Sequence, residues 1–170
     1  MGKQRIADSI ATDGLSIMLR WLKNLFGPSA SNQHIESCSR AVLVFMRSVK
    51  NHVDHRDFMI PNHHTFFYCY AYGAITVEAA KYNLNETERF AALLLLFPNL
   101  SDMSPDEISA LMNRCVNFLD DKEGQQYQQD GTEHYTRWCN ADAGVTDILG
   151  KLFALREQEL SKANRAIIYP

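Results

Sequence analysis

The sequence predicts an all-α protein, a single-domain bundle of six or seven helices around a short buried central helix. Three observations predict it: apolar residues recur at helical spacing in several long segments, two segments begin with strong capping signals, and no stretch is a convincing strand. A chain of 170 residues, 46% hydrophobic and 22% charged, can bury one core. We therefore expect residues 1–170 to form one helical domain.

The first segment is expected to be a leader followed by an amphipathic helix. Residues 1–12 show weak helical character, and we expect them to be disordered or frayed. Residues 13–27 are predicted to be helical until Gly27 and Pro28 end the helix. One side of this helix carries Leu15, Met18, Trp21, Leu22, Leu25 and Phe26. Only Arg20 and Lys23 supply cations nearby, so we expect packing on the domain or across a dimer, and not on a membrane surface.

Two longer helices are expected to follow, over residues 33–53 and 66–82, with a loop at 54–62 between them. The aromatic run from 66 to 72 would also suit a strand. We favour a helix there, because no other segment offers a pairing partner and an isolated strand leaves its backbone groups unpaired. The continuation from Ala74 to Tyr82 has plain helical character.

The predicted central helix spans residues 85–97. Asn85 is a good N-cap residue, and Glu88 stands three positions later, where it can bond back to the cap. From 90 to 97 eight apolar residues follow without interruption, and Pro98 ends the run. A membrane span needs about 20 apolar residues, so this helix is expected to be surrounded by protein.

The second half of the chain contains the clearest capping box. Ser104, Pro105 and Glu107 predict a helix start, and apolar residues continue at helical spacing to Leu119. Two glycines, at 124 and 131, then bracket a polar, glutamine-rich piece that precedes residues 132–139. A last helix is expected from about 142 to 163.

Charge is unevenly distributed along the chain. The net charge is −3, yet residues 84–135 contain ten acidic and three basic residues, a net charge of −7, whereas residues 1–83 carry +3. The overall balance gives no electrostatic reason to bind nucleic acid, and no helix pair has a basic recognition helix. The acidic region is read either as solvated helix faces or as a surface for a basic partner.

The cysteines form no C-x-x-C motif, and three of them fall on apolar helix faces. Their positions are Cys38, Cys69, Cys115 and Cys139. Buried free thiols are expected, which favours a reducing compartment. No apolar segment has the length of a membrane span, and the first residues lack a signal-peptide core, so the sequence predicts a cytoplasmic location.

A histidine cluster is the candidate metal site. His52 and His55 are three residues apart at a predicted helix end, and His63 lies near them in sequence. Two imidazoles can ligate zinc or iron, but the spacing matches no known signature, and surface or capping roles are favoured. The chain contains no Glu-x-x-His or His-Glu-x-x-His motif and no glycine-rich phosphate loop. We expect no cofactor.

Aromatic rings with polar tips form the candidate binding surface. Tyr127, His134, Tyr135 and Trp138 lie within one short segment, and Trp21 adds a further exposed candidate. Tyrosine and tryptophan are enriched in protein interfaces and also line small-molecule pockets. The competing interpretation is an amphipathic helix that lies on the core with its polar tips in water.

Two functional hypotheses follow. The first is a non-enzymatic, soluble helical protein that acts through protein–protein interaction or self-association, with a protein partner or a second copy as its target. The alternative is a small-molecule- or metal-binding helical enzyme that uses the His52 and His55 cluster or the group from Tyr127 to Trp138. The absence of a catalytic motif from the sequence favours the first hypothesis.

Overall fold

The computed structural model describes residues 30–53, 61–101, 103–155 and 158. Within these ranges the chain forms helices and turns and contains no strand, so the predicted all-α fold is confirmed. The leader and the amphipathic helix expected at 13–27 lie outside the described residues. Most of the loop predicted at 54–62 and the end of the last helix lie outside them as well.

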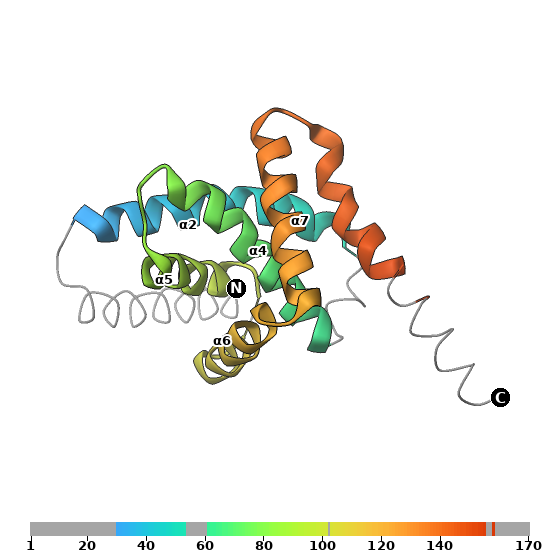
Figure 1. Cartoon of the computed structure of the whole chain (residues 1–170), viewed down its shortest axis with the longest axis horizontal. Coiled ribbons are helices and arrows are strands. Elements are labelled where there is room, and N and C mark those ends of the chain that lie inside the picture. The colour runs from blue at the N-terminus through green and yellow to red at the C-terminus, as the bar shows by residue number, and fades with distance from the viewer. Residues whose placement is uncertain (1–29, 54–60, 102, 156–157, 159–170) are drawn as a thin grey trace, which may run out of the picture.

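Helix α4 (Pro61–Ala80) lies at the centre of the bundle (Figure 1). From residue 63 to 75 every side chain except His64 is buried. The helix packs against α2, α5, α6 and α7, so apolar and aromatic residues are needed on all of its sides. The aromatic run is therefore helical, as predicted. Pro61 and its neighbour, expected in a loop, form the first turn, where proline is well tolerated.

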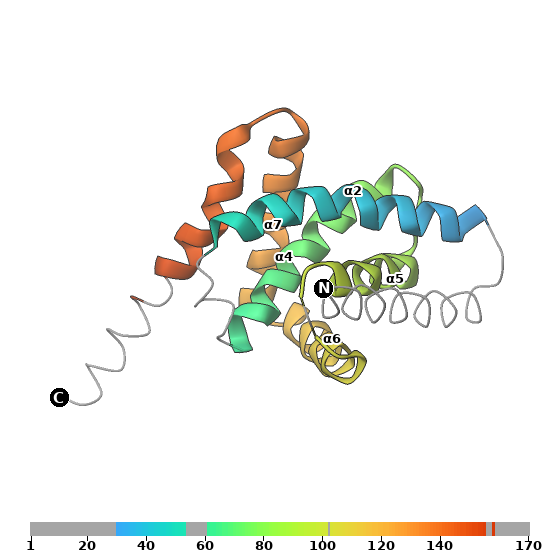
Figure 2. The same cartoon turned by 180° about the vertical axis from the view of Figure 1, so that it is seen from behind.

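Helix α2 (Ala30–His52) lies along one side of α4 and matches the helix predicted at 33–53 (Figure 2). Its buried face repeats at three- and four-residue intervals, which places the side chains in one stripe. This stripe comprises Ile35, Cys38, Val42, Phe45, Met46 and Val49. The opposite face of α2 is exposed to solvent.

Helix α5 (Glu86–Leu96) is the helix that we predicted to be central, and its capping box is confirmed. The Asn85 side chain accepts a hydrogen bond from the Glu88 amide at 3.0 Å, and the Asn85 amide donates to the Glu88 carboxylate at 2.8 Å. Phe90 and Leu94 are only half-buried. α5 packs mainly on α2 and α4, so α4 is more central than the short helix. The 3₁₀ turn η1 (Phe97–Asn99) follows.

Helix α6 (Pro105–Leu119) begins with the predicted capping box, in which Ser104 and Glu107 bond to each other's amides. Helix α7 (Lys122–Cys139) then runs without a break through the glutamine-rich piece that two glycines bracket. The 3₁₀ turn η2 (Ala143–Asp147) leads into a helix over residues 148–155. This last helix runs back beside α7 (Figure 1).

The two glycines lie within α7 and do not end it. Gly131, near the centre of the helix, has a packing role. A Cβ added at Gly131 would lie 1.9 Å from the Tyr70 carbonyl oxygen, and one at Gly73 would lie 2.0 Å from the Gln128 carbonyl oxygen. Real Cβ atoms essentially never come closer than 3.0 Å. The backbones of α4 and α7 therefore touch at a crossing that only glycine permits on both helices.

We expect Gly131→Ala to destabilise the fold by about 1–3 kcal/mol, because a methyl group at this crossing forces the helices apart. This loss outweighs the gain of up to about 1 kcal/mol that alanine gives in a helix interior. Urea unfolding followed by circular dichroism measures the change. Gly144→Ala is the matched control, since its new Cβ meets its nearest neighbour at 3.6 Å. Equal stability of the two variants would contradict the crossing.

Candidate functional site

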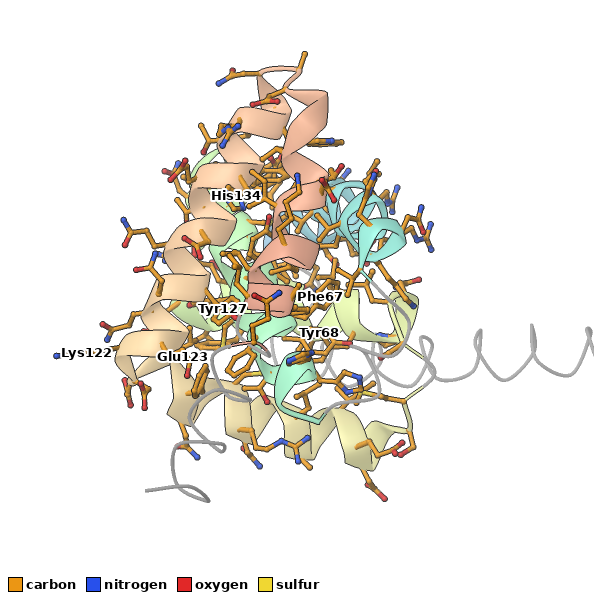
Figure 3. All side chains as sticks on the ribbon, turned by 90° about the vertical axis from the view of Figure 1, so that its right-hand side faces the viewer. Phe67, Tyr68, Lys122, Glu123, Tyr127 and His134 are labelled. Atoms are coloured by element: carbon orange, nitrogen blue, oxygen red, sulfur yellow. The ribbon has the colours of Figure 1, made fainter. Side chains whose placement is uncertain are left out.

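The predicted aromatic group lies on one helix, α7, but faces the interior. Tyr127, His134 and Tyr135 are buried, and Trp138 is half-buried against the core. Figure 3 shows the side chains of Tyr127 and His134 pointing from α7 toward α4, whereas Lys122 points to solvent. The group is therefore the inner face of α7, and not a surface open to a partner.

A tyrosine–histidine pair joins α4 to α7. The Tyr70 hydroxyl lies 2.9 Å from His134 Nδ1, and both side chains are buried. Burial lowers the pKa of His134, although Asp130 and Glu133 oppose the shift. Burial also raises the pKa of Tyr70. A neutral imidazole has one acceptor nitrogen, and a protonated hydroxyl can donate to it. The two groups can therefore satisfy each other without a buried charge.

A second polar pair lies further along the same two helices. The Tyr135 hydroxyl donates to Glu78 Oε2 at 2.8 Å, and the Lys81 ammonium pairs with the same oxygen. Glu78 is only 4% exposed, whereas Lys81 extends to the surface. Burial raises the pKa of Tyr135, and the hydrogen bond to Glu78 raises it further. The buried carboxylate is thus held by one neutral and one charged donor.

Aromatic rings pack around these pairs. Phe45 of α2 lies 5.3 Å from the Tyr135 ring and 5.6 Å from the Trp138 ring, measured between centroids. At the other end of α7, Tyr127 stacks on Phe66 at 4.8 Å. Burial raises the pKa of Tyr127 to about 12. The rings enclose the polar pairs and reduce their contact with water, which strengthens the hydrogen bonds.

Tyr70 and Glu78, the α4 partners of the two polar pairs, were not among the residues predicted for the site. A signal for Glu78 was present: it is the only Asp, Glu, Lys or Arg residue between positions 61 and 80. A lone carboxylate in an otherwise apolar, buried helix needs a partner. Nothing in the local sequence distinguishes Tyr70 from its aromatic neighbours.

Among the residues that the structure describes, the predicted histidine cluster does not form a metal site. His52 is exposed, and its Nδ1 lies 2.8 Å from the Ser48 carbonyl oxygen at the end of α2. His63 is buried, and its ring stacks on Phe153 at 4.5 Å. His55 lies outside the described residues. Among the residues that the structure places, no three His, Cys, Asp or Glu side chains are grouped as metal ligands.

The remaining predicted residues are distributed as follows. Trp21 lies outside the described residues. Three of the four free cysteines are buried, as expected, and Cys139 is exposed. Within the described ranges no helix is long and apolar enough to cross a membrane.

Among the described residues three outward helix positions expose a large apolar side chain: Val44 on α2, Val116 on α6 and Leu155 on the last helix. On α2, Arg40, Val44 and Arg47 follow each other at intervals of four and three residues, so they form one stripe, and Val44 is 56% exposed. On α6, Val116 is 45% exposed and stands one turn before Asp120. We call the first two the α2 stripe (Arg40, Val44, Arg47) and the α6 patch (Val116, Asp120).

Comparison with known proteins gives no further guide to the site. No protein-family model, no curated protein and no solved structure matches the chain. The chemistry of the described residues is therefore the basis for a functional proposal.

We expect Tyr135→Phe to destabilise the protein by about 1–3 kcal/mol, because it removes a donor from the buried Glu78 carboxylate. Thermal and urea unfolding provide the measurement. Tyr82, whose ring is half-buried against His34, supplies the control, and Tyr82→Phe should change stability by less than about 0.5 kcal/mol. A similar cost for both variants would show that the Glu78 bond has no special role.

We expect the unfolding free energy to fall as the pH drops below about 6.5, the ordinary pKa of histidine. The pKa of His134 is lower in the folded protein, so the unfolded chain binds more protons in this range and is favoured. The contribution is fully present above pH 6.5 and is lost as the pH falls through the folded pKa. Urea unfolding of wild type and His134→Gln between pH 7 and pH 5 tests it. Equal pH slopes would contradict the assignment.

Proposed function

We propose that this chain is a non-enzymatic helical protein that acts by binding another protein, or a second copy of itself, through the α2 stripe. The observation that carries the proposal is the exposed Val44 between Arg40 and Arg47 on the outward face of α2. Arginine is enriched at protein interfaces because its planar fork binds carboxylates in two places, while its stem covers apolar surface.

The composition of the stripe indicates the class of partner. Two guanidinium groups that flank an apolar side chain complement an acidic surface with an apolar residue at its centre. The α6 patch has this kind of composition, with Asp120 one turn after the exposed Val116. α2 lies above α6 in all three views, so the two surfaces belong to helices in different parts of the molecule (Figures 1, 2 and 3). A second copy can therefore serve as the partner.

The buried tyrosine pairs support a structural role for the interior. In each pair the donor and the acceptor come from two helices, so the polar groups hold α4 and α7 in one arrangement. A fixed interior keeps the outward residues of α2 and α6 in a constant geometry, which lowers the cost of binding. A cytoplasmic location is part of the proposal, since all four cysteines are free thiols.

We expect the double variant Arg40→Glu, Arg47→Glu to lose the partner or the self-association of the wild-type protein, because the stripe would then repel an acidic surface. Affinity capture and light scattering at low and high salt provide the measurement. A 10-fold or greater loss corresponds to at least about 1.4 kcal/mol. The fold should be unaffected, because both arginines are exposed.

The control is the double variant Lys122→Glu, Lys151→Glu, which makes the same change in net charge at two other exposed lysines. It should retain the partner. If both double variants bind alike, the interaction depends on net charge and not on the stripe. If the wild-type protein is a strict monomer that retains no partner, the proposed function fails.

A further inference from the structure

Cys69 of α4 and Cys115 of α6 are two buried thiols on helices that pack against each other. Cys69 is fully buried, and Cys115 is 1% exposed. They are 46 residues apart in sequence, so the fold alone brings them together. The Cys115 thiol lies 4.0 Å from the Thr65 carbonyl oxygen, one helical turn before Cys69.

The geometry of a helix places the Cys69 sulfur over the same turn of α4. Side chains on an α-helix tilt toward its N-terminus, so a residue covers the turn that precedes its own Cα. The Cys69 side chain therefore covers the turn that begins at Thr65, where the Cys115 sulfur lies. Consistent with this placement, the neighbouring Cys115 thiol, together with burial, raises the pKa of Cys69.

We propose that Cys69 and Cys115 are a latent disulfide pair, which a small peroxide converts into a covalent link between α4 and α6. One sulfur attacks the peroxide oxygen, the O–O bond breaks, and a sulfenic acid and one water form. The second sulfur then attacks the sulfenic sulfur, an S–S bond forms, and a second water leaves with the remaining thiol proton. The peroxide is reduced by two electrons and the two thiols are oxidised by two.

Cys38 provides an internal control within the same molecule. It is as buried as Cys69, and its thiol lies 3.9 Å from the Ile75 carbonyl oxygen, so it also contacts a helix backbone. Burial raises its pKa to about 12. Burial and backbone contact are thus matched between Cys38 and the pair. The thiol–thiol contact of Cys69 with Cys115 is the feature that the experiment isolates.

The link would fix α6 in place. α6 packs mainly against α4 and α7, and the rings of Phe66 and Phe118 lie 5.1 Å apart in the same interface. A disulfide there restricts the unfolded chain and so favours the folded state. Because α6 carries the α6 patch, oxidation would also hold one proposed binding surface rigid. This last consequence rests on the proposed function, whereas the disulfide itself does not.

The experiment uses the full chain with Cys139→Ser, which removes the exposed thiol. The protein is treated with hydrogen peroxide, unfolded in the presence of iodoacetamide, which alkylates free thiols, and digested with trypsin. Trypsin places the cysteines on separate peptides: Cys38 on residues 24–40, Cys69 on 57–81 and Cys115 on 115–122. We expect peptides 57–81 and 115–122 to be joined with the loss of two hydrogens, while Cys38 is alkylated. Dithiothreitol should release the two peptides, and the oxidised protein should melt at a higher temperature.

The reaction is followed until Cys38 is itself oxidised, so that every outcome is decisive. If Cys38 reacts while peptides 57–81 and 115–122 are recovered separately, the proposal fails. A link that includes Cys38 also overturns it. Partner binding is measured on the same oxidised and reduced samples: a joined pair with no binding in either state would overturn the proposed function and leave the disulfide intact.

Discussion

The contact between the backbones of α4 and α7 at Gly73 and Gly131 determines where the other interior groups lie. A Cβ at either position would fall within about 2 Å of the opposite backbone, so the helices approach more closely than ordinary side chains allow. This approach lets the Thr132 hydroxyl reach the Gly73 carbonyl oxygen at 3.2 Å. It also places Tyr70 opposite His134 within hydrogen-bonding distance. A wider crossing would separate the buried Tyr70 and His134 side chains, and leaving such groups unpaired costs about 1–3 kcal/mol for each.

The two tyrosine pairs give the α4–α7 interface a single register. An apolar interface tolerates small sliding motions, because dispersion contacts have little directional preference. Hydrogen bonds from Tyr70 to His134 and from Tyr135 to Glu78 are directional, and a shift of either helix would break both. Glu78 is the more demanding partner, since a buried carboxylate without donors is strongly disfavoured. The polar groups therefore fix the register of the interface, and the glycines allow its two helices to approach closely.

Local signals in the sequence predicted the helices. The features that depend on long-range contacts could not be predicted from the sequence. Capping boxes at Asn85 and Ser104 depend on residues three positions apart, so they are readable from the sequence and are confirmed. The central position of α4 depends on four other helices, and its aromatic run matched a strand as well as a helix. Gly131 was read as a boundary, because the backbone that it contacts, at Tyr70, lies 61 residues away in the chain. The inward orientation of His134 and Tyr135 could not be predicted for the same reason: Tyr70 and Glu78 lie on another helix.

Because the interior polar groups are engaged across α4 and α7, the interaction proposal depends on the outer faces of α2 and α6. The same helices that bury an apolar stripe must present their other side to water, and charged residues are expected there. Exposed large apolar side chains deviate from that pattern, and among the described residues they are Val44 on α2 beside arginines, Val116 on α6 one turn before Asp120, and Leu155 on the last helix. Solvation alone explains the charges but gives no reason to expose Val44 and Val116. A contact that covers both valines and pairs their neighbouring charges explains the two features together.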